Sequence, residues 1–314
     1  MSTFIDIFFN KKILIYGLGK SGISAFKFLK KKSKVFIYDD FKSKKNNISF
    51  KDIYKSQFDK IIISPGIDIN KCKLSKFLKL NKDKIYSDLD VFYSFYNNDC
   101  ITITGTNGKS TTCQLLYEIL LDQKIDVRLV GNIGNPILSA KNIKKKTIFI
   151  IEASSYQLEY SKIFKSKYAA ILNISPDHID RHKTFKNYIK AKLKLIKNQL
   201  KNHSSFVKKN DLLINKELKN KKIQSKIINV DVNKITKNFN ELNNPYFLTE
   251  TNKENLAFAL KISKKLNAKN YLLLKTINNF KGLKYRQQIV YKKKNLTIIN
   301  DSKSTSFSSS KSIL

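Results

Sequence analysis

The chain has 314 residues, of which 41% are hydrophobic and 27% are charged. This composition supports two domains of about 100–200 residues and excludes a disordered tail. No stretch approaches the roughly 18 consecutive apolar residues that span a bilayer, and no basic-then-apolar leader opens the chain, so neither a membrane span nor a signal peptide is predicted. Three scattered cysteines, Cys72, Cys100 and Cys113, predict no disulfide framework and a reduced, cytoplasmic protein.

The formal net charge of +37 raises the question of a nucleic-acid partner. Only Arg128, Arg181 and Arg286 among the 61 basic residues are arginines, although arginine supplies the bidentate fork of most nucleic-acid surfaces. The lysines are spread along the chain, and the abundance of Lys, Asn, Ile and Phe is typical of an AT-rich genome. We therefore predict solvated lysine faces and no specific nucleic-acid role.

Short apolar runs alternate with helical stretches, which predicts an α/β protein with a mostly parallel sheet. Strands are predicted at residues 13–16, 35–38, 61–63, 101–104, 148–151, 169–174, 212–214 and 227–230. Helices are predicted at residues 21–31, 111–121, 184–200, 255–266 and 272–280, followed by a hairpin at 287–291 and 296–299. A polar stretch at residues 88–99 precedes the predicted strand at 101–104, which begins a new series of strands and helices, so a domain boundary is expected there.

The strongest local signal is Gly105-Thr106-Asn107-Gly108-Lys109-Ser110-Thr111, which lies between a predicted strand and a predicted helix. Such a loop offers free backbone N–H groups at a helix N-terminus, a lysine for the terminal phosphates and a hydroxyl for Mg²⁺. The general motif has a glycine where this chain has Ile103, but Gly105 supplies one within the loop. The motif predicts a nucleoside triphosphate site.

A second glycine motif, Gly17-x-Gly19-x-x-Gly22, also follows a predicted strand and opens a predicted helix. Asp39 follows about twenty residues later at the end of the next strand, as in a dinucleotide fingerprint. The physical content is a diphosphate on a helix N-terminus and an acid near a ribose, which any nucleoside diphosphate satisfies. NAD is one candidate, although an NAD enzyme has no need of a second loop for a triphosphate.

Polar groups follow two further predicted strands. Glu152 ends the strand at 148–151, and an acid there commonly holds Mg²⁺ beside a phosphate loop. His178 lies in an Asp-His-Ile-Asp-Arg run after the strand at 169–174, which favours a functional role, whereas His182 and His203 are interpreted as structural. Lys192 cannot be distinguished by spacing from the other lysines.

Together these motifs resemble the Mur ligases of peptidoglycan synthesis, from residue 13 to about residue 305. The resemblance also rests on Ser64-Pro65-Gly66-Ile67, Gly131-Asn132-Ile133-Gly134, Gly282-Leu283-Lys284-Tyr285-Arg286 and Asn300-Asp301-Ser302-Lys303. The blocks at 154–158 and 177–181 look most like those of the D-glutamate-adding members. The resemblance implies a Rossmann-like N-terminal domain (1–92), a P-loop ATPase-like central domain (93–300) and the start of a C-terminal domain (301–314).

The resemblance also implies residue roles. Substrate binding is implied for Gly19, Lys20, Ser21, Asp39, Asp40, Gly66, Asn132 and Gln157. ATP binding is implied for the loop Gly105, Thr106, Asn107, Gly108, Lys109, Ser110 and Thr111, and for Asn255, Arg286 and Asp301. One Mg²⁺ is implied at Ser110 and Glu152, and a second at His178 and a carbamylated Lys192; Lys109, His178, Lys192 and Lys303 are the implied catalytic residues.

The implied reaction is ATP-dependent amide synthesis through an acyl phosphate, joining D-glutamate to UDP-N-acetylmuramoyl-L-alanine in a cytoplasmic, monomeric enzyme of cell-wall synthesis. Most of the family's C-terminal domain is not in the chain, whose residues 304–314 resemble the start of that domain's first helix. We therefore expect substrate binding with little or no ligase activity of the chain alone. The alternatives are a sister Mur or folylpolyglutamate-type ligase, a non-catalytic nucleotide-binding module, and a lysine-rich nucleic-acid binder.

Overall fold

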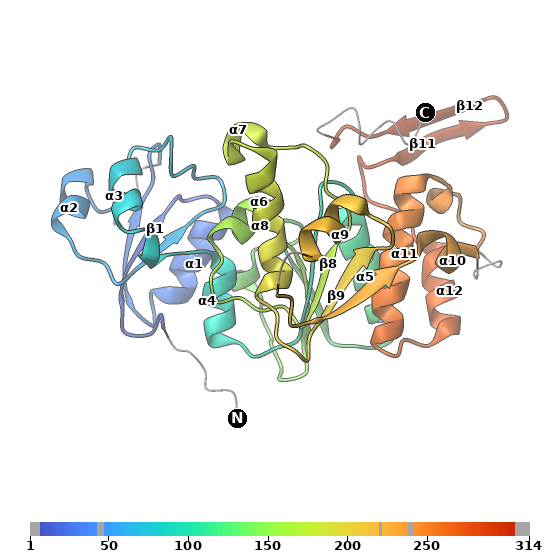
Figure 1. Ribbon diagram of the computed structural model, residues 1–314, viewed down its shortest axis with the longest axis horizontal. Helices are drawn as coiled ribbons and strands as arrows, with labels where there is room; N and C mark the ends of the chain where they lie inside the picture. Colours follow the sequence, from blue (N-terminus) through green and yellow to red (C-terminus); the bar gives the residue numbers. More distant parts are fainter. Residues whose placement is uncertain (1–6, 43–46, 220–221, 238–241, 305–314) are drawn as a thin grey trace.

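The computed structural model describes residues 7–42, 47–219, 222–237 and 242–304. Two parallel sheets lie side by side, with a helical layer and a projecting hairpin beyond the second sheet (Figure 1). The part of the predicted C-terminal segment that covers residues 305–314 lies outside the described residues. The architecture confirms the predicted α/β class with mostly parallel sheets.

The first sheet has the strand order β2-β1-β3-β4, and its strands are parallel. Its strands are β1 (Lys12–Tyr16), β2 (Lys34–Tyr38), β3 (Lys60–Ile63) and β4 (Ile85–Tyr86). The helices that connect or follow them are α1 (Lys20–Leu29), α2 (Phe50–Lys55), α3 (Ser75–Leu80), the 3-10 turn η1 (Lys82–Lys84) and α4 (Asp88–Phe95). The order reverses between β1 and β3, and ligands of parallel sheets bind at such a reversal.

The second sheet has the order β10-β9-β8-β5-β7-β6 and is also parallel. Its strands are β5 (Cys100–Thr104), β6 (Val127–Gly131), β7 (Ile148–Glu152), β8 (Tyr168–Ile171), β9 (Ser204–Lys208) and β10 (Lys226–Val230). Here the order reverses between β5 and β8. The loops after these two central strands therefore define a second crevice at the carboxyl edge.

The remaining elements cover the second sheet or extend from it. They are α5 (Lys109–Asp122), η2 (Ile137–Ser139), α6 (Ser155–Tyr160), α7 (Ile179–His182), α8 (Phe185–Lys197), α9 (Leu212–Lys219), α10 (Val232–Lys237), η3 (Pro245–Leu248), α11 (Glu250–Lys265) and α12 (Asn270–Asn279). An antiparallel hairpin, β11 (Gln288–Lys293) and β12 (Leu296–Asn300), follows. Helices α11 and α12 pack against α5, and the hairpin projects at one end (Figure 1).

One apolar cluster joins the first sheet to the second. It contains Ile13 and Ile15 of β1, Phe92 of α4 and Phe149 of β7, all fully buried. The rings of Phe92 and Phe149 meet edge to face at 4.7 Å, so α4 packs directly on the second sheet. A second cluster fills the space between the other face of that sheet and α5, α11 and α12.

The segment at residues 88–99 was wrongly predicted to be a polar connection. Residues 88–95 form the buried helix α4, because Leu89, Val91 and Phe92 supply an apolar face that the second sheet covers. The predicted domain boundary after residue 92 falls inside this helix, and the division into domains remains a prediction.

The predicted strand at 212–214 is also wrong. These three apolar residues form the first turn of α9, where the Ile214 N–H donates to the Asp211 carboxylate at 2.9 Å. The predictions also missed three strands: β4 and β6, which each form an edge of their sheet, and β9, which lies between β8 and β10.

The three cysteines are free, as predicted. Across the described part of the chain, no helix has the length and apolar character to cross a membrane.

Candidate functional site

The first glycine loop is a tight turn that the protein itself requires. Gly17 has φ +95°, and its carbonyl accepts a 2.7 Å hydrogen bond from the Ser64 hydroxyl on the loop after β3. A Cβ on Gly22 would overlap the Gly17 carbonyl oxygen, so the loop and α1 approach as closely as backbones can. These contacts join the two loops at the reversal point of the first sheet.

Two further glycines in this region border open space. A Cβ on Gly19 or on Gly66 would meet nothing within 4 Å, and both residues are exposed. Gly19 is the N-cap of α1, and Lys20 and Ser21 form the first turn of that helix. The free N–H groups of the start of α1 thus lie beside open space, and this region at the reversal point of the first sheet is called the first cradle below.

Asp39 and Asp40 hold the rim of this cradle. The Asp39 carboxylate accepts from the backbone N–H groups of Leu18 (2.6 Å), Phe41 and Lys42 (both 3.0 Å). Burial raises the pKa of Asp39, but these three hydrogen bonds outweigh it and leave that pKa below its usual value. Asp40 accepts from the Tyr16 hydroxyl at 2.7 Å. Asp39 therefore stabilises the first glycine loop through its hydrogen bond with Leu18, independently of any contact with a ligand.

The second phosphate loop lies at the reversal point of the second sheet and is held by the loop after β8. The Thr106 N–H donates to the Asn173 carbonyl at 3.0 Å, and the Asn107 N–H donates to the Asn173 side-chain oxygen at 2.9 Å. The Ser175 N–H donates to the Thr106 hydroxyl at 3.0 Å. The loop is therefore shaped by a segment almost seventy residues away.

Lys109 opens α5, and its ammonium group turns back on the phosphate loop. Its Nζ donates to the carbonyls of Gly105 (3.0 Å) and Thr106 (2.7 Å). Burial lowers the pKa of Lys109, while the nearby Glu152 carboxylate opposes that change. Gly108 precedes it with φ +81°, and a Cβ there would overlap the Asn255 side chain.

Ser110 and Glu152 meet at the carboxyl edge of the sheet. The Ser110 hydroxyl donates to Glu152 Oε2 at 2.8 Å, and the Asn132 amide donates to Glu152 Oε1 at 2.8 Å. Glu152 is 1% exposed and ends β7 beside β5. The structure thus brings together the two residues predicted to hold one Mg²⁺, Ser110 and Glu152, and Asn132, which was predicted to bind substrate.

Lys192 of α8 is buried beneath the phosphate loop. It is 1% exposed, and its Nζ donates to the Gly105 carbonyl at 2.6 Å and lies 4.5 Å from the centre of the Tyr188 ring. Burial lowers the pKa of Lys192 well below its usual value, and the neighbouring Lys109 adds to the effect. The Tyr188 hydroxyl lies 3.1 Å from the Thr106 hydroxyl. The amine is thus distinct from the many surface lysines.

His178 lies at the N-cap of α7, at the rim of this crevice. Its backbone is left-handed (φ +53°), its side chain is 42% exposed, and its ring contacts those of Tyr156 and Tyr188. The same Tyr188 ring lies over Lys192. His178 and Lys192 therefore approach one tyrosine from different elements.

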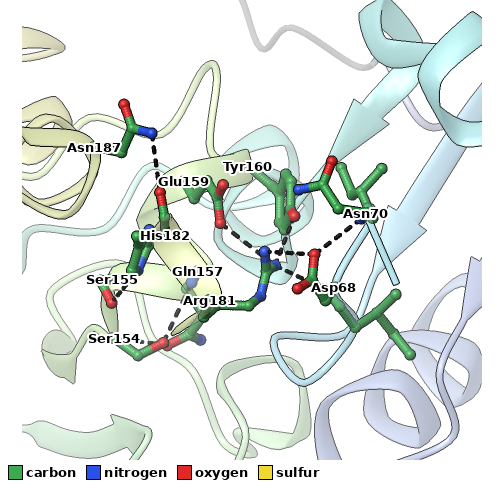
Figure 2. A network of polar contacts seen from close by, with 12 residues as sticks. Asp68, Asn70, Ser154, Ser155, Gln157, Glu159, Tyr160, Arg181, His182 and Asn187 are labelled. Carbon is green, nitrogen blue, oxygen red and sulfur yellow. Dashed lines mark hydrogen bonds and ion pairs between the residues drawn. The ribbon is translucent and has the colours of Figure 1, made fainter. Parts of the chain in front are cut away.

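The short helix α7 is anchored by two side chains on its inner side. Arg181 contacts Asp68, Glu159 and Tyr160, and His182 Nε2 lies 2.9 Å from the Ser155 hydroxyl (Figure 2). Burial lowers the pKa of His182 to about 4, with Arg181 adding to the effect. The structural interpretation of His182 agrees with its buried hydrogen bond.

Gln157 of α6 points into the protein. Its amide donates to the Asp88 carboxylate at 3.1 and 3.3 Å, and its oxygen accepts from the Ser154 N–H at 3.2 Å. Gln157 is 3% exposed, and Asp88 belongs to α4. In this arrangement Gln157 links two helices, and its contact with a substrate remains a prediction.

A cavity beside the phosphate loop gathers most of the remaining residues predicted to bind ATP. Its lining includes Asn107, Gly108, Thr111, Tyr246, Asn252, Asn255, Arg286, Gln287, Asp301 and Ser304. The Asn255 side-chain oxygen accepts from the Thr112 hydroxyl at 3.3 Å, which ties α11 to α5. Lys303 lies outside this lining, and its Nζ is 5.8 Å from the centre of the Tyr285 ring. Residues from three distant parts of the chain thus face one space.

The residues around Ser110 fit a hard cation. A hydroxyl and a carboxylate oxygen are the donors that Mg²⁺ prefers, and nucleotide phosphates and water would complete its shell. Over the residues that the structure describes, no three His, Cys, Asp or Glu side chains form a metal cluster. A binding site for Mg²⁺ here therefore depends on the nucleotide as well as the protein.

Three residues that support the site, Asn173, Tyr188 and Asp88, were not predicted from the sequence. Each contacts a predicted site residue, but across a large separation in the chain or from inside a helix. The position of Tyr188 four residues before Lys192 on α8 was the one local signal, since such residues share a helix face.

Comparison with known proteins gives a consistent result. Residues 103–276 match the model of the Mur ligase middle domain. A UDP-N-acetylmuramoylalanine–D-glutamate ligase of Rickettsia felis is 34% identical over 94% of this chain and 71% of its own length. One of the same name from Buchnera aphidicola is 36% identical over 98% of this chain and 75% of its own length.

Solved structures share the fold. A UDP-N-acetylmuramate:L-alanyl-γ-D-glutamyl-meso-diaminopimelate ligase of Neisseria meningitides aligns with a TM-score of 0.59 over 87% of this chain and 99% of its own, at 13% identity. The MurF ligase of Thermotoga maritima in complex with ADP aligns with a TM-score of 0.55 over 92% of this chain and 67% of its own, at 14% identity. Because the family model matches more than half of the chain, and a relative 34% identical is covered over 71% of its length, the chain belongs to the Mur ligase family.

Proposed function

We propose that this protein takes part in the ATP-dependent joining of D-glutamate to UDP-N-acetylmuramoyl-L-alanine, in cytoplasmic peptidoglycan precursor synthesis. The observation that carries the proposal is that two glycine loops each lie at a helix start and at the reversal point of their own parallel sheet. The name shared by the two relatives supports the choice of substrates. One cradle serves a sugar nucleotide and the other serves ATP.

The first cradle would bind the UDP portion of the substrate. Its diphosphate would lie at the N-terminus of α1, near Gly19, Lys20 and Ser21, with Gly66 opposite. Asp39 and Asp40 would line the uridine side, where Asp39 already closes the turn. Asn132 and Gln157 would lie toward the muramoyl group, with the Asn132 amide oriented by Glu152.

The second cradle would bind ATP. Lys109 would leave the Gly105 and Thr106 carbonyls and turn to the β- and γ-phosphates, while residues 105–111 would surround the phosphates. Asn255, Arg286 and Asp301 would contact the nucleotide from the adjoining cavity, and Lys303 would close on it. Magnesium would be held by Ser110 and Glu152, where it offsets the repulsion between anionic reactants.

The chemistry proposed is an in-line phosphoryl transfer followed by amide formation. The L-alanine carboxylate attacks the γ-phosphorus and ADP leaves. The neutral D-glutamate amine then attacks the acyl carbon, phosphate leaves, and the amine nitrogen loses one proton, which the departing phosphate or solvent takes up. Lys109 would hold the transferring group, and binding both reactants on one chain would orient them. The exposed His178 side chain would contact the reacting groups.

Lys192 would serve as a carbamate. Its neutral amine adds to CO₂ and releases a proton, which converts a cation into an oxygen donor for a second Mg²⁺ beside His178. The lowered pKa of Lys192, caused by burial, increases the fraction of neutral amine at pH 7. Under CO₂, the protein would be treated with trimethyloxonium, which alkylates and so traps a carbamate. Mass spectrometry would then detect the adduct on Lys192.

The decisive experiment is calorimetric titration of the chain with UDP-N-acetylmuramoyl-L-alanine, NADH and a folate. We expect the UDP substrate to bind, and we expect no binding of NADH or of the folate. A matched pair of variants locates the site: Gly19→Ala places a methyl group in the cradle, whereas Lys79→Ala alters an exposed position on α3. Binding of NADH in place of the UDP substrate would refute the proposal.

A further inference from the structure

Arg181 is an unusual residue for this chain, because only three of its 61 basic residues are arginines. Its side chain is 11% exposed, and it lies where α6, α7 and the loop after β3 meet (Figure 2). The guanidinium carbon also lies 5.4 Å and 5.6 Å from the ring centres of Tyr156 and Tyr160. The proposed reaction assigns no role to this residue.

The two terminal nitrogens of Arg181 reach two segments, the loop after β3 and helix α6. Nη1 lies 3.2 Å from Asp68 Oδ1. Nη2 donates to the Ile67 carbonyl at 2.8 Å and to the Tyr160 hydroxyl at 2.6 Å, and it lies 3.4 Å from Glu159 Oε2. A lysine has one nitrogen and no planar fork, so it cannot reach both sides of this junction at once.

On one side, Arg181 contacts the loop that borders the first cradle. Ile67 and Asp68 directly follow Gly66, and the Ile67 side chain packs beside Gly17, 3.0 Å from where a Cβ would stand. The Ser64 hydroxyl of the same loop donates to the Gly17 carbonyl at 2.7 Å. A ligand that displaces or fixes this loop therefore acts on the partners of Arg181.

On the other side, Arg181 belongs to the helical turn that fixes His178. The His178 carbonyl accepts from the N–H groups of Arg181 (3.1 Å) and His182 (3.0 Å). The Tyr156 ring contacts both side chains, since its centre lies 5.1 Å from that of the His178 ring and 5.4 Å from the guanidinium carbon of Arg181. Because His178 has a left-handed backbone, its ring direction depends on how this turn is held.

We propose that Arg181 is a positioning residue that transmits occupancy of the first cradle to His178 at the second. The coupling runs from the loop at residues 64–68, through the guanidinium group, to α7. The inference rests on the proposed function, because it takes the first cradle as a nucleoside diphosphate site. It adds a mechanical link between two sites that the proposed reaction must align.

The test uses the full chain labelled with isotopic histidine and UDP as the probe. The three histidines give three ring signals by nuclear magnetic resonance, and His178→Gln identifies the signal of His178. Calorimetry first establishes that UDP binds. In the wild type, saturating UDP is expected to shift the His178 signal; in Arg181→Lys at least half of that shift is expected to be lost, even at saturation.

Two further variants keep the test sharp. Arg128→Lys is the matched control and should retain the wild-type shift. Arg128 pairs with Asp126, at a distance of 2.5 Å, and neither residue belongs to the two cradles. Asp68→Asn removes the partner on the other side of the junction and should reproduce the loss, even if Arg181→Lys fails to fold. A merely structural role would lower the melting temperature without uncoupling the signal from bound UDP.

The outcomes separate the two proposals. If UDP binds and the His178 signal shifts equally in the wild type, Arg181→Lys and Asp68→Asn, the coupling is refuted and the proposed function stands. If UDP binds but the wild-type signal does not move, the coupling is likewise refuted. If the wild type binds neither UDP nor the UDP substrate, the proposed function fails, and the coupling fails with it.

Discussion

Single residues decide whether each cradle can accept a phosphate. Gly108 and Gly19 are both glycines of phosphate loops, but their surroundings differ. Gly108 has a positive φ and is covered by Asn255, whereas Gly19 has an ordinary φ of −72° and borders open space. A methyl group should therefore affect folding at one position and ligand binding at the other.

For Gly108→Ala we expect a loss of about 1–3 kcal/mol in the free energy of unfolding, because a left-handed backbone is strained for alanine. The Asn255 side chain must also move, so affinity for ADP with Mg²⁺ should fall at least about tenfold, equivalent to 1.4 kcal/mol. Urea unfolding and calorimetry measure the two effects. Unchanged ADP affinity would show that the loop does not hold the nucleotide.

For Gly19→Ala we expect the free energy of unfolding to stay within about 0.5 kcal/mol of the wild type. The added methyl group points into the first cradle, so affinity for UDP should fall while affinity for ADP is unchanged. The comparison of both ligands in one variant is the internal control. Equal losses for UDP and ADP would contradict separate sites.

His182 should make stability depend on pH. The pKa of His182 is about 4 in the folded protein and about 6.5 in an unfolded chain. The unfolded state therefore binds the proton first, so its contribution to stability is full above pH 6.5 and is lost as the pH falls toward 4. Between pH 7 and pH 5 we expect a loss on the order of 1 kcal/mol from this group.

Urea unfolding of His182→Gln at both pH values isolates this contribution, since glutamine can bond to Ser155 without titrating. The variant should lose less stability than the wild type on acidification. His178→Gln, at an exposed ring, is the matched control. A pH dependence equal in His182→Gln and the wild type would contradict the assignment.

At the scale of elements, α4 owes its position to one buried carboxylate. Asp90 is fully buried. It accepts hydrogen bonds both from Ser87, the N-cap of α4, and from the turn that follows α6. Its donors are the N–H groups of Ser87, Lys162, Ile163 and Phe164 and the hydroxyls of Ser87 and Ser161. A carboxylate accepts at both oxygens, which is what this turn requires.

Replacing Asp90 with asparagine turns an amide N–H₂ toward backbone donors. We expect the free energy of unfolding to fall by about 3 kcal/mol, because buried donors lose a charged acceptor. Asp83→Asn, at an exposed position on η1, should change it by less than about 0.5 kcal/mol. Equal unfolding midpoints in urea for the two variants would refute this role for Asp90.

For the whole molecule, two separate cradles predict two separable stabilisations. A ligand present at 100 times its dissociation constant raises the free energy of unfolding by about 2.7 kcal/mol. UDP and ADP with Mg²⁺ should each raise the melting temperature of the wild type. Lys109→Met removes the ammonium group of the second loop and should abolish only the ADP effect.

Differential scanning calorimetry of the two proteins with each ligand provides the measurement. Lys265→Met removes a different lysine, one at an exposed position near the end of α11, and should leave both stabilisations in place. Loss of the UDP effect in Lys109→Met would mean that the two ligands share one site.

The local sequence was sufficient to predict those elements whose conformation depends on residues adjacent in the chain. The glycine loops after residues 16 and 104 were predicted correctly because tight turns at a helix start need particular residues at fixed spacing. The run at 212–214 was not, because three apolar residues fit a strand or a helical turn equally well. Likewise the apolar face of α4 was overlooked among its polar neighbours.

The amino-acid sequence by itself determined the α/β class, the positions of the two glycine loops and the family. Tertiary structure alone decided how the site is assembled, since Thr106 meets Tyr188, Asn132 meets Glu152, and Arg181 meets Asp68 across long stretches of chain. The first two pairs form because parallel strands of the second sheet bring their carboxyl ends to one edge, and the third forms where the two sheets pack together. Local propensity carries no information about either arrangement, because the strand order and the packing of the sheets, and not the residue spacing, set which loops become neighbours.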